Sequence, residues 1–140
     1  MATSIGLFDY PFLSNGDFTS TGSPTQYRFV KLTSSPLTVA RATSSSNPYA
    51  IGVAQANPNA SGLEVPVRLY GTTQVYANAD ASPIAIGSFV VSGSDGQAQT
   101  QGDVSGSATT QGIALQALSS GCGVLIEVLL LPYGVKVAAS

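Results

Sequence analysis

Alternation of apolar and polar residues runs through much of the chain and predicts β-strands. The clearest case is "LEVPVRLY" (residues 63–70), where four apolar residues alternate with Glu64, Pro66 and Arg68. One face of such a strand is buried and the other meets water. Pro66 has no N–H to donate to a ladder, which predicts an edge strand or a bulged one. Further strands are expected over residues 26–32, 49–56, 72–77, 88–93, 112–118 and 123–131.

Turn residues separate these segments, and no window has the apolar spacing of a long helix. Asp95-Gly96, between two strand patterns, is typical of a tight hairpin. The stretch 80–87 fits either a helical turn that begins at Pro83 or a loop. Short strands divided by turn residues indicate an all-β fold, a small β-sandwich or barrel with little or no helix.

A similar unit occurs twice, in residues 49–71 and 112–134. Each copy contains Gly-Val/Ile-Ala, a polar turn and an apolar strand, and each ends in Tyr-Gly. An internal duplication of this kind predicts two hairpins that share one core. In the second copy, residues 124–131 are apolar on both faces except at Glu127. The outer face of this strand is therefore expected against a second layer of the sheet or against another chain.

The N-terminal residues 1–25 are rich in aromatic rings and in turn residues, which predicts an extended arm ahead of a single β domain at 26–140. Burial of one such ring is worth about 1.5–3 kcal/mol. The arm is therefore expected to pack, either on its own domain or on another chain. Its apolar residues are Ile5, Leu7, Phe8, Tyr10, Phe12 and Phe18.

Charge is scarce: charged residues make up 9% of the chain and the net charge is −2, whereas an average soluble domain has about 25%. This composition is typical of a low-charge soluble protein or of a surface covered by partner chains. The five basic residues are dispersed, so neither nucleic acid nor a membrane is expected as a partner. The longest apolar run is too short to span a bilayer, and the first residues lack a signal-peptide pattern, which favours synthesis in a cytoplasm.

The residues needed for catalysis are missing or dispersed. The chain has no histidine, and Cys122, its one cysteine, therefore has no imidazole to activate it. Seven carboxylates are scattered, and no glycine-rich phosphate-binding motif occurs. We therefore expect no enzyme activity, no catalytic residue, no metal site and no cofactor.

The ordered pieces "GVA", "V.V", "G...V.A", "I..G" and "GIAL.A" resemble those of the small capsid decoration, or cement, proteins of tailed bacteriophages, the group labelled DUF2190. The resemblance covers roughly residues 49–131. The arm and the residues after Leu131 depart from the pattern. The matching positions are Gly52, Val53, Ala54, Val65, Val67, Gly71, Val75, Ala77, Ile84, Gly87, Gly112, Ile113, Ala114, Leu115, Ala117, Gly123 and Val128.

This resemblance implies a homotrimer on the outer surface of an icosahedral capsid, where it would cement a lattice of major capsid protein with an HK97-like fold. The protein would be made in the host cytoplasm and end in the virion. On this basis we assign Leu125, Leu129 and Leu131 to the trimer interface. The apolar residues of the arm are assigned to capsid binding. A phage tail or fibre protein and a glycan-binding adhesin remain alternatives, although the absence of Trp weighs against the adhesin.

Overall fold

A computed structural model describes residues 8–20, 24–43, 50–93, 95–100 and 108–137, with the backbone alone at 108–109 and 132–137. The described residues form strands and no helix, so none of them belongs to a helix that could cross a membrane. Residues 80–87 form a loop, held by a bridge between Ile84 and Leu118. The strands are β1 (Phe8–Ser14), β2 (Phe29–Leu32), β3 (Thr38–Arg41), β4 (Ala50–Ala54), β5 (Glu64–Asn78), β6 (Phe89–Ser92), β7 (Ala98–Thr100), β8 (Ala108–Ala114) and β9 (Cys122–Val137).

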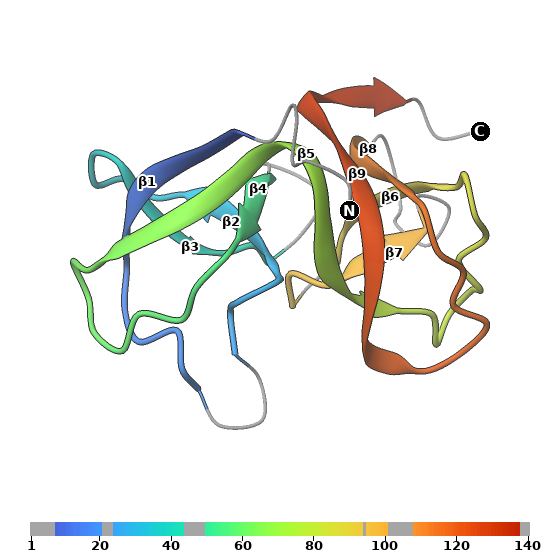
Figure 1. The fold of residues 1–140 in the computed structure, drawn as a ribbon, viewed down its shortest axis with the longest axis horizontal. Helices are drawn as coiled ribbons and strands as arrows, with labels where there is room; N and C mark the ends of the chain where they lie inside the picture. Colours follow the sequence, from blue (N-terminus) through green and yellow to red (C-terminus); the bar gives the residue numbers. More distant parts are fainter. Residues whose placement is uncertain (1–7, 21–23, 44–49, 94, 101–107, 138–140) are drawn as a thin grey trace, which may run out of the picture.

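The strands close into two rings of five that share β5 (Figure 1). The first ring runs β1-β3-β2-β4-β5 and closes because β1 pairs with both β3 and β5. The second ring runs β5-β7-β6-β8-β9 and closes because β9 pairs with both β8 and β5. The predicted all-β barrel class is therefore confirmed. In Figure 1 the first ring lies on the left and the second on the right.

The shared strand β5 joins two segments that the sequence predicts as separate strands, 63–70 and 72–77. Gly71, between them, has a φ of 99°, at which the backbone of a residue with a side chain would be strained. The strand therefore continues through this residue and changes its partners there, from β1 and β4 to β7 and β9. The expected hairpin at Asp95-Gly96 is also found, and it connects β6 to β7.

The prediction that Pro66 belongs to an edge strand is wrong, whereas the alternative of a bulged strand agrees with the register shift of β5 against β1 between Phe8 and Asp9. Pro66 lies opposite Pro11 of β1, and on the other side its carbonyl accepts a hydrogen bond from the N–H of Gln55 at 2.9 Å. The missing N–H of Pro66 would point to the same side, toward the carbonyl of Gln55. That carbonyl instead accepts a hydrogen bond from the Gln26 amide at 2.9 Å. A side chain thus replaces the one ladder bond that the proline removes.

Each ring has its own core, and neighbouring residues of one strand serve different cores. Val30 of β2 and Ala54 of β4 face the core of the first ring. Phe29 and Val53, next to them, belong to the core that the second ring builds. At these positions β2 and β4 are thus buried on both faces, because the second ring packs on the outer face of the first. The expectation that the two hairpins share a core is confirmed for one of the two cores, in which Val53 of β4 lies in the same buried cluster as Val128 of β9.

The two rings have matching strand registers. In each ring a row of three residues crosses three neighbouring strands on the outer face, and the second row lies 60 or 61 positions after the first. The rows are Phe29–Val53–Arg68 across β2, β4 and β5, and Phe89–Ile113–Leu129 across β6, β8 and β9. This correspondence supports the proposed internal duplication and extends it beyond the two hairpins.

The same close approach occurs next to each row. A Cβ atom added at Gly52 would lie 2.3 Å from the carbonyl oxygen of Arg68. At Gly112 it would lie 2.7 Å from the carbonyl oxygen of Leu129. Real Cβ atoms do not approach backbone oxygens so closely, and each hairpin therefore requires glycine at the equivalent position.

We predict that Gly52→Ala and Gly112→Ala each lower the free energy of unfolding by about 1–3 kcal/mol, because the added methyl group pushes apart two paired backbones. Urea denaturation of the purified variants measures this change. The matched control is Gly16→Ala, since a Cβ atom at Gly16 meets nothing within 4 Å. Equal stability of all three variants would contradict the close approach in both hairpins.

Candidate binding surfaces

The described part of the predicted arm is not free, because residues 8–14 form β1 of the first ring. Phe12 and Phe18 are buried in that ring's own core. Their assignment to capsid binding is therefore corrected: the alternative, that the arm packs on its own domain, holds for these two rings. Ile5 and Leu7 lie outside the described residues.

Phe8 and Tyr10 remain available at the surface. The side chain of Phe8 is 52% exposed and lies opposite the exposed Tyr70 of β5. Tyr10 is partly exposed and its ring packs against that of Phe12, with 5.1 Å between the ring centroids. An ion pair between Asp9 and Arg68, at 2.7 Å, fastens this end of β1 to β5. These aromatic rings form a fixed apolar surface and not a flexible arm.

The outer edge of β1 is poorly suited to adding another strand. Within the described residues, β1 pairs along this edge only from Leu13 onward, where the Leu13 N–H donates to the Leu37 carbonyl at 2.8 Å. Residues two positions apart point their backbone groups to the same side, so Pro11 also faces this edge. Because Pro11 has no N–H, it weakens the edge as a template for strand addition. Binding at β1 would therefore depend on side chains.

The residues assigned to the trimer interface lie on the outer face of β9. Leu125 is exposed, Leu129 and Leu131 are half-buried, and the alternate residues of β9 face the core. β9 pairs with β5 on one side and with β8 on the other, so only this outer face is open to a partner. The structure brings the three leucines onto one face, and their contact with another copy stays a prediction.

The sequence reasoning missed the apolar residues that continue this face. Leu129 lies opposite Ile113 of β8, and Ile113 lies opposite Phe89 of β6, which is 44% exposed. Leu115, directly after the end of β8, is exposed as well. Glu127 is the charged residue of this stretch of β9. A signal for Phe89 was present in the sequence, because Phe-Val at 89–90 repeats Phe-Val at 29–30.

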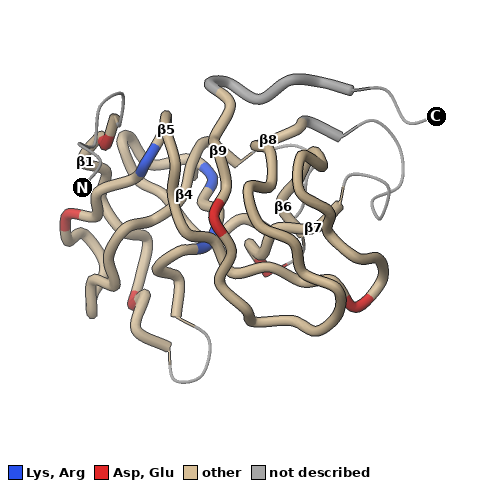
Figure 2. Tube along the Cα trace, turned by 45° about the vertical axis from the view of Figure 1, so that its right-hand side comes forward, with Lys and Arg blue, Asp and Glu red and all other residues tan. Residues whose placement is uncertain are grey.

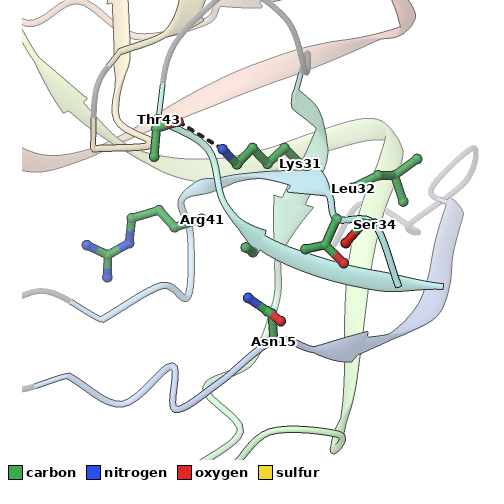
Figure 3. Close-up of a pocket in the computed structure, with 8 residues that line it drawn as sticks. Asn15, Lys31, Leu32, Ser34, Arg41 and Thr43 are labelled. Atoms are coloured by element: carbon green, nitrogen blue, oxygen red, sulfur yellow. Dashed lines mark hydrogen bonds between the residues drawn. The ribbon is translucent and has the colours of Figure 1, made fainter. Parts of the chain in front are cut away.

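A shallow hollow of about 620 Å³ lies on the β2–β3 hairpin (Figure 3). Lys31 crosses it and donates a hydrogen bond to the Thr43 hydroxyl at 2.9 Å. Arg41 extends to the side away from Leu32 and Ser34. No carboxylate, thiol or imidazole lines the hollow, so its residues offer no acid–base pair for catalysis. The other lining residues are Asn15, Thr33 and Ala40.

An ionic cluster joins the two rings. The side chain of Arg28 is almost fully buried and contacts the carboxylate of Asp95 at 2.8 Å, while Arg41 contacts its other oxygen at 2.7 Å. Arg28 also lies over the ring of Tyr76, 5.0 Å from its centroid. Arg28 and Arg41 thus hold the β6–β7 turn against the first ring. Figure 2 shows acidic positions on both rings.

The pKa values in this cluster follow from burial and pairing. Burial tends to raise the pKa of Asp95, but the hydrogen bond from Arg41 and the charges of both arginines outweigh it, so the pKa lies below its usual value. Burial lowers the pKa of Arg28, and the charge of Asp95 opposes this shift. Asp95 is therefore a carboxylate at neutral pH, and its charge contributes to holding the rings together.

The described residues contain no group of three metal-ligating side chains. Cys122 is exposed, and the negative charge of Asp80 raises the pKa of its thiol, with a hydrogen bond to Asp80 acting in the same direction. A protonated thiol is a poor nucleophile and a poor metal ligand. The exposed apolar residues of β1 and β9 are the candidate contact surfaces of the described residues.

Comparisons with known proteins agree with this picture of an all-β structural protein. The profile of the phage cement protein family matches residues 15–130, so the chain belongs to the phage cement protein family. The fold is similar to the solved structure of the head fibre gp8.5 N base in bacteriophage phi29. The TM-score is 0.54 at 16% identity, and the match covers 89% of this chain and 94% of that one. No curated protein matches the chain.

Membership of this family makes the chain a structural protein of a phage virion, associated with the capsid. The likeness to the head fibre base shows the fold alone, because the two sequences are only 16% identical. The resemblance to cement proteins that the sequence motifs indicate is thereby confirmed, and the match extends further toward the N-terminus than those motifs do.

We predict that Asp95→Asn lowers the free energy of unfolding at neutral pH by about 1–3 kcal/mol, since it leaves the buried Arg28 without a counter-ion. Because the pKa of Asp95 in the folded protein lies below its usual value of 3.8, this contribution is present above pH 3.8 and is lost as the pH falls further. Urea titrations at several pH values should show wild type and variant converging in acid.

The control for this prediction is Glu64→Gln, because Glu64 is an exposed carboxylate of β5. It should leave the urea midpoint nearly unchanged at every pH. A constant difference between Asp95→Asn and wild type down to the most acidic condition would show that the charge of Asp95 does not fasten the rings.

Proposed function

We propose that this protein binds the outer surface of an icosahedral phage capsid as a homotrimer and cements the lattice of major capsid protein. The observation that carries the proposal is the match of the phage cement protein family over residues 15–130. A capsid lattice built from proteins of the HK97-like fold is the partner that the family resemblance implies. The direct test is a pair of cryo-EM maps of particles assembled with and without this chain.

The surface composition supports a role in protein contact. In the described residues, three of the four basic side chains are paired with carboxylates, namely Arg28, Arg41 and Arg68. Lys31 forms no ion pair there. Little unpaired positive charge remains to attract a charged partner, so apolar contact would supply most of the binding energy. Surface ion pairs would add only about 0–1 kcal/mol each.

Of the apolar arm residues assigned to capsid binding, the two on β1 that stay exposed in the described residues are Phe8 and Tyr10. Phe8 and Tyr10, with Tyr70 beside Phe8, present apolar area on a rigid strand. A fixed surface loses little conformational entropy when it binds. Phe12 and Phe18 would contribute indirectly, by holding β1 in place from the core.

We predict that Phe8→Ala and Tyr10→Ala weaken binding to purified empty capsids while leaving the urea midpoint nearly unchanged. Binding of the wild type should vary little between low and high salt, because the contact is apolar. Phe12→Ala should instead destabilise the fold by about 3–5 kcal/mol, as expected for a buried ring. Co-sedimentation with capsids and urea denaturation measure the two effects separately.

The matched control for the capsid measurement is Lys31→Gln, which removes the unpaired cation and should bind like wild type. A steep loss of binding with added salt, with Phe8→Ala and Tyr10→Ala near wild type, would reverse the conclusion. It would assign the contact to the hollow around Lys31, since Arg28 is buried. Retention on a glycan array without capsid binding would favour an adhesin.

We predict that Leu129→Glu converts the trimer to a soluble monomer, because a charge in the centre of the outer face of β9 opposes burial against another copy. Light scattering coupled to size exclusion measures the mass. Tyr70→Glu, on the first ring, is the control and should remain trimeric. Should Leu129→Glu be insoluble, Leu125→Glu tests the same face at a more exposed position. A soluble trimer in both cases would sink the assignment of this interface.

A further inference from the structure

The two equivalent rows differ in what covers them. In the first ring Phe29 and Val53 are 0% exposed, because the second ring packs on them. In the second ring, Phe89 is 44% exposed and Ile113 and Leu129 are half-buried. The chain therefore buries Phe29 and Val53 of the first row within itself and leaves the equivalent Phe89 and Ile113 of the second row at least partly open.

The part of the second ring that covers Phe29 includes the β6–β7 turn. The N–H of Phe29 donates to the carbonyl of Gly96, in that turn, at 2.8 Å. Gly96 has a φ of 70°, and a Cβ atom there would lie 2.9 Å from the Phe29 carbonyl oxygen. The contact is thus between the backbone of a hairpin turn and the strand that carries the row.

The equivalent turn of the first ring joins β2 to β3 and has Leu37 where the second ring has Gly96. In the first ring Leu32 pairs with Val39, and Leu37 lies two positions before Val39. In the second ring Ser92 pairs with Ala98, and Gly96 lies two positions before Ala98. Leu37 also has a positive φ, 52°, which disfavours a leucine. Its side chain is 56% exposed. A strained and exposed leucine on this turn gains nothing from the core, which points to a role outside the monomer.

We propose that the β2–β3 turn of one copy, with Leu37 at its tip, binds the Phe89–Ile113–Leu129 row of a second copy in a head-to-tail contact. The occupant is a second copy because the same chain already places the equivalent turn against Phe29, the equivalent of Phe89 in the first row. This inference rests on the self-association in the proposed function, and it adds which surface of one copy meets which surface of the next.

The charges fit this arrangement. The turn follows Lys31, the described cation without an ion pair, and the row adjoins Glu127, for which no ion pair is found in the described residues either. Arg28 and Arg41 are the partners of Asp95 within the chain. At the positions of the second ring that correspond to these two arginines stand Ser88 and Thr100. The contact between copies therefore lacks that ionic cluster and would depend mainly on apolar burial.

A head-to-tail contact uses two different surfaces, so it continues from copy to copy until rotation closes the assembly. A closed trimer is one such cyclic assembly. In it every row would be occupied by the turn of a neighbour, and no apolar row would stay exposed. A contact that paired two identical rows would instead stop at a dimer.

The test uses the full chain and two variants on opposite sides of the contact. Phe89→Ser should weaken self-association at least tenfold in sedimentation analysis, as expected for the loss of a central aromatic contact. Leu37→Gly should weaken it similarly and yet raise the urea midpoint, because glycine accepts the positive φ. Tyr70→Ser removes an equally exposed ring elsewhere and should associate like wild type.

Cross-linking then tests the pairing itself, in a Cys122→Ser background. Chains carrying Leu37→Cys, mixed with tagged chains carrying Phe89→Cys, should form an intermolecular disulfide under mild oxidation. Neither chain alone should do so. A disulfide between two Phe89→Cys chains would show a symmetric contact and overturn the proposal. A wild type that stays monomeric, or a Phe89→Ser variant that associates normally, would overturn it as well.

Capsid binding, measured in parallel, separates this inference from the proposed function. Head-to-tail association without any binding to capsids would leave the inference standing and remove the cementing role. Normal capsid binding by chains in which Leu37 of one copy never contacts Phe89 of another would leave the cementing role standing and remove the inference.

Discussion

The pairing of one strand with both rings is the constraint on which the rest of the structure depends. β5 has β1 and β4 beside its first half and β7 and β9 beside its second. A shift of its register would move side chains between core and solvent in both rings at once. Gly71 makes this sharing feasible, because its positive φ lets the strand redirect without a break. The two rings are therefore expected to fold as one cooperative unit.

Apolar packing closes the rings, and charge is concentrated where they meet. Only 9% of the residues are charged, yet Arg28, Arg41 and Asp95 lie together at the junction. A buried arginine is costly unless it is paired and hydrogen-bonded. Here its guanidinium also donates to the carbonyls of Pro24 and Asp95. The cluster thus selects one orientation of the β6–β7 turn, which apolar contacts alone would fix less strictly.

Local pattern predicted the fold class and most strands, because alternation and turn residues are local properties. It failed for β1, since Pro11 and the closely spaced rings of this segment look irregular until β5 is alongside. It also missed β3, four residues between turn signals. Ring closure depends on pairings between distant segments, such as β5 with β9, which no local pattern contains. The predicted apolar stripe of β9 lies on an outer face. The assignment of Phe12 and Phe18 to capsid binding is wrong, because a sequence can indicate that an aromatic ring is buried but not which surface buries it.

The difference between the two rows is itself informative about selection on this surface. The first row ends in Arg68, whose charge is neutralised by Asp9 at the rim of the buried contact. The second row has Leu129 at that position and Thr72 in place of Asp9. A charged pair at that end of the second row would have suited a face that meets only water, because charged residues favour solubility. Leu129, at the open end of the duplicated unit, is better explained by burial against a partner. In a repeat array, likewise, the last repeat exposes the surface that every earlier repeat buries against its neighbour.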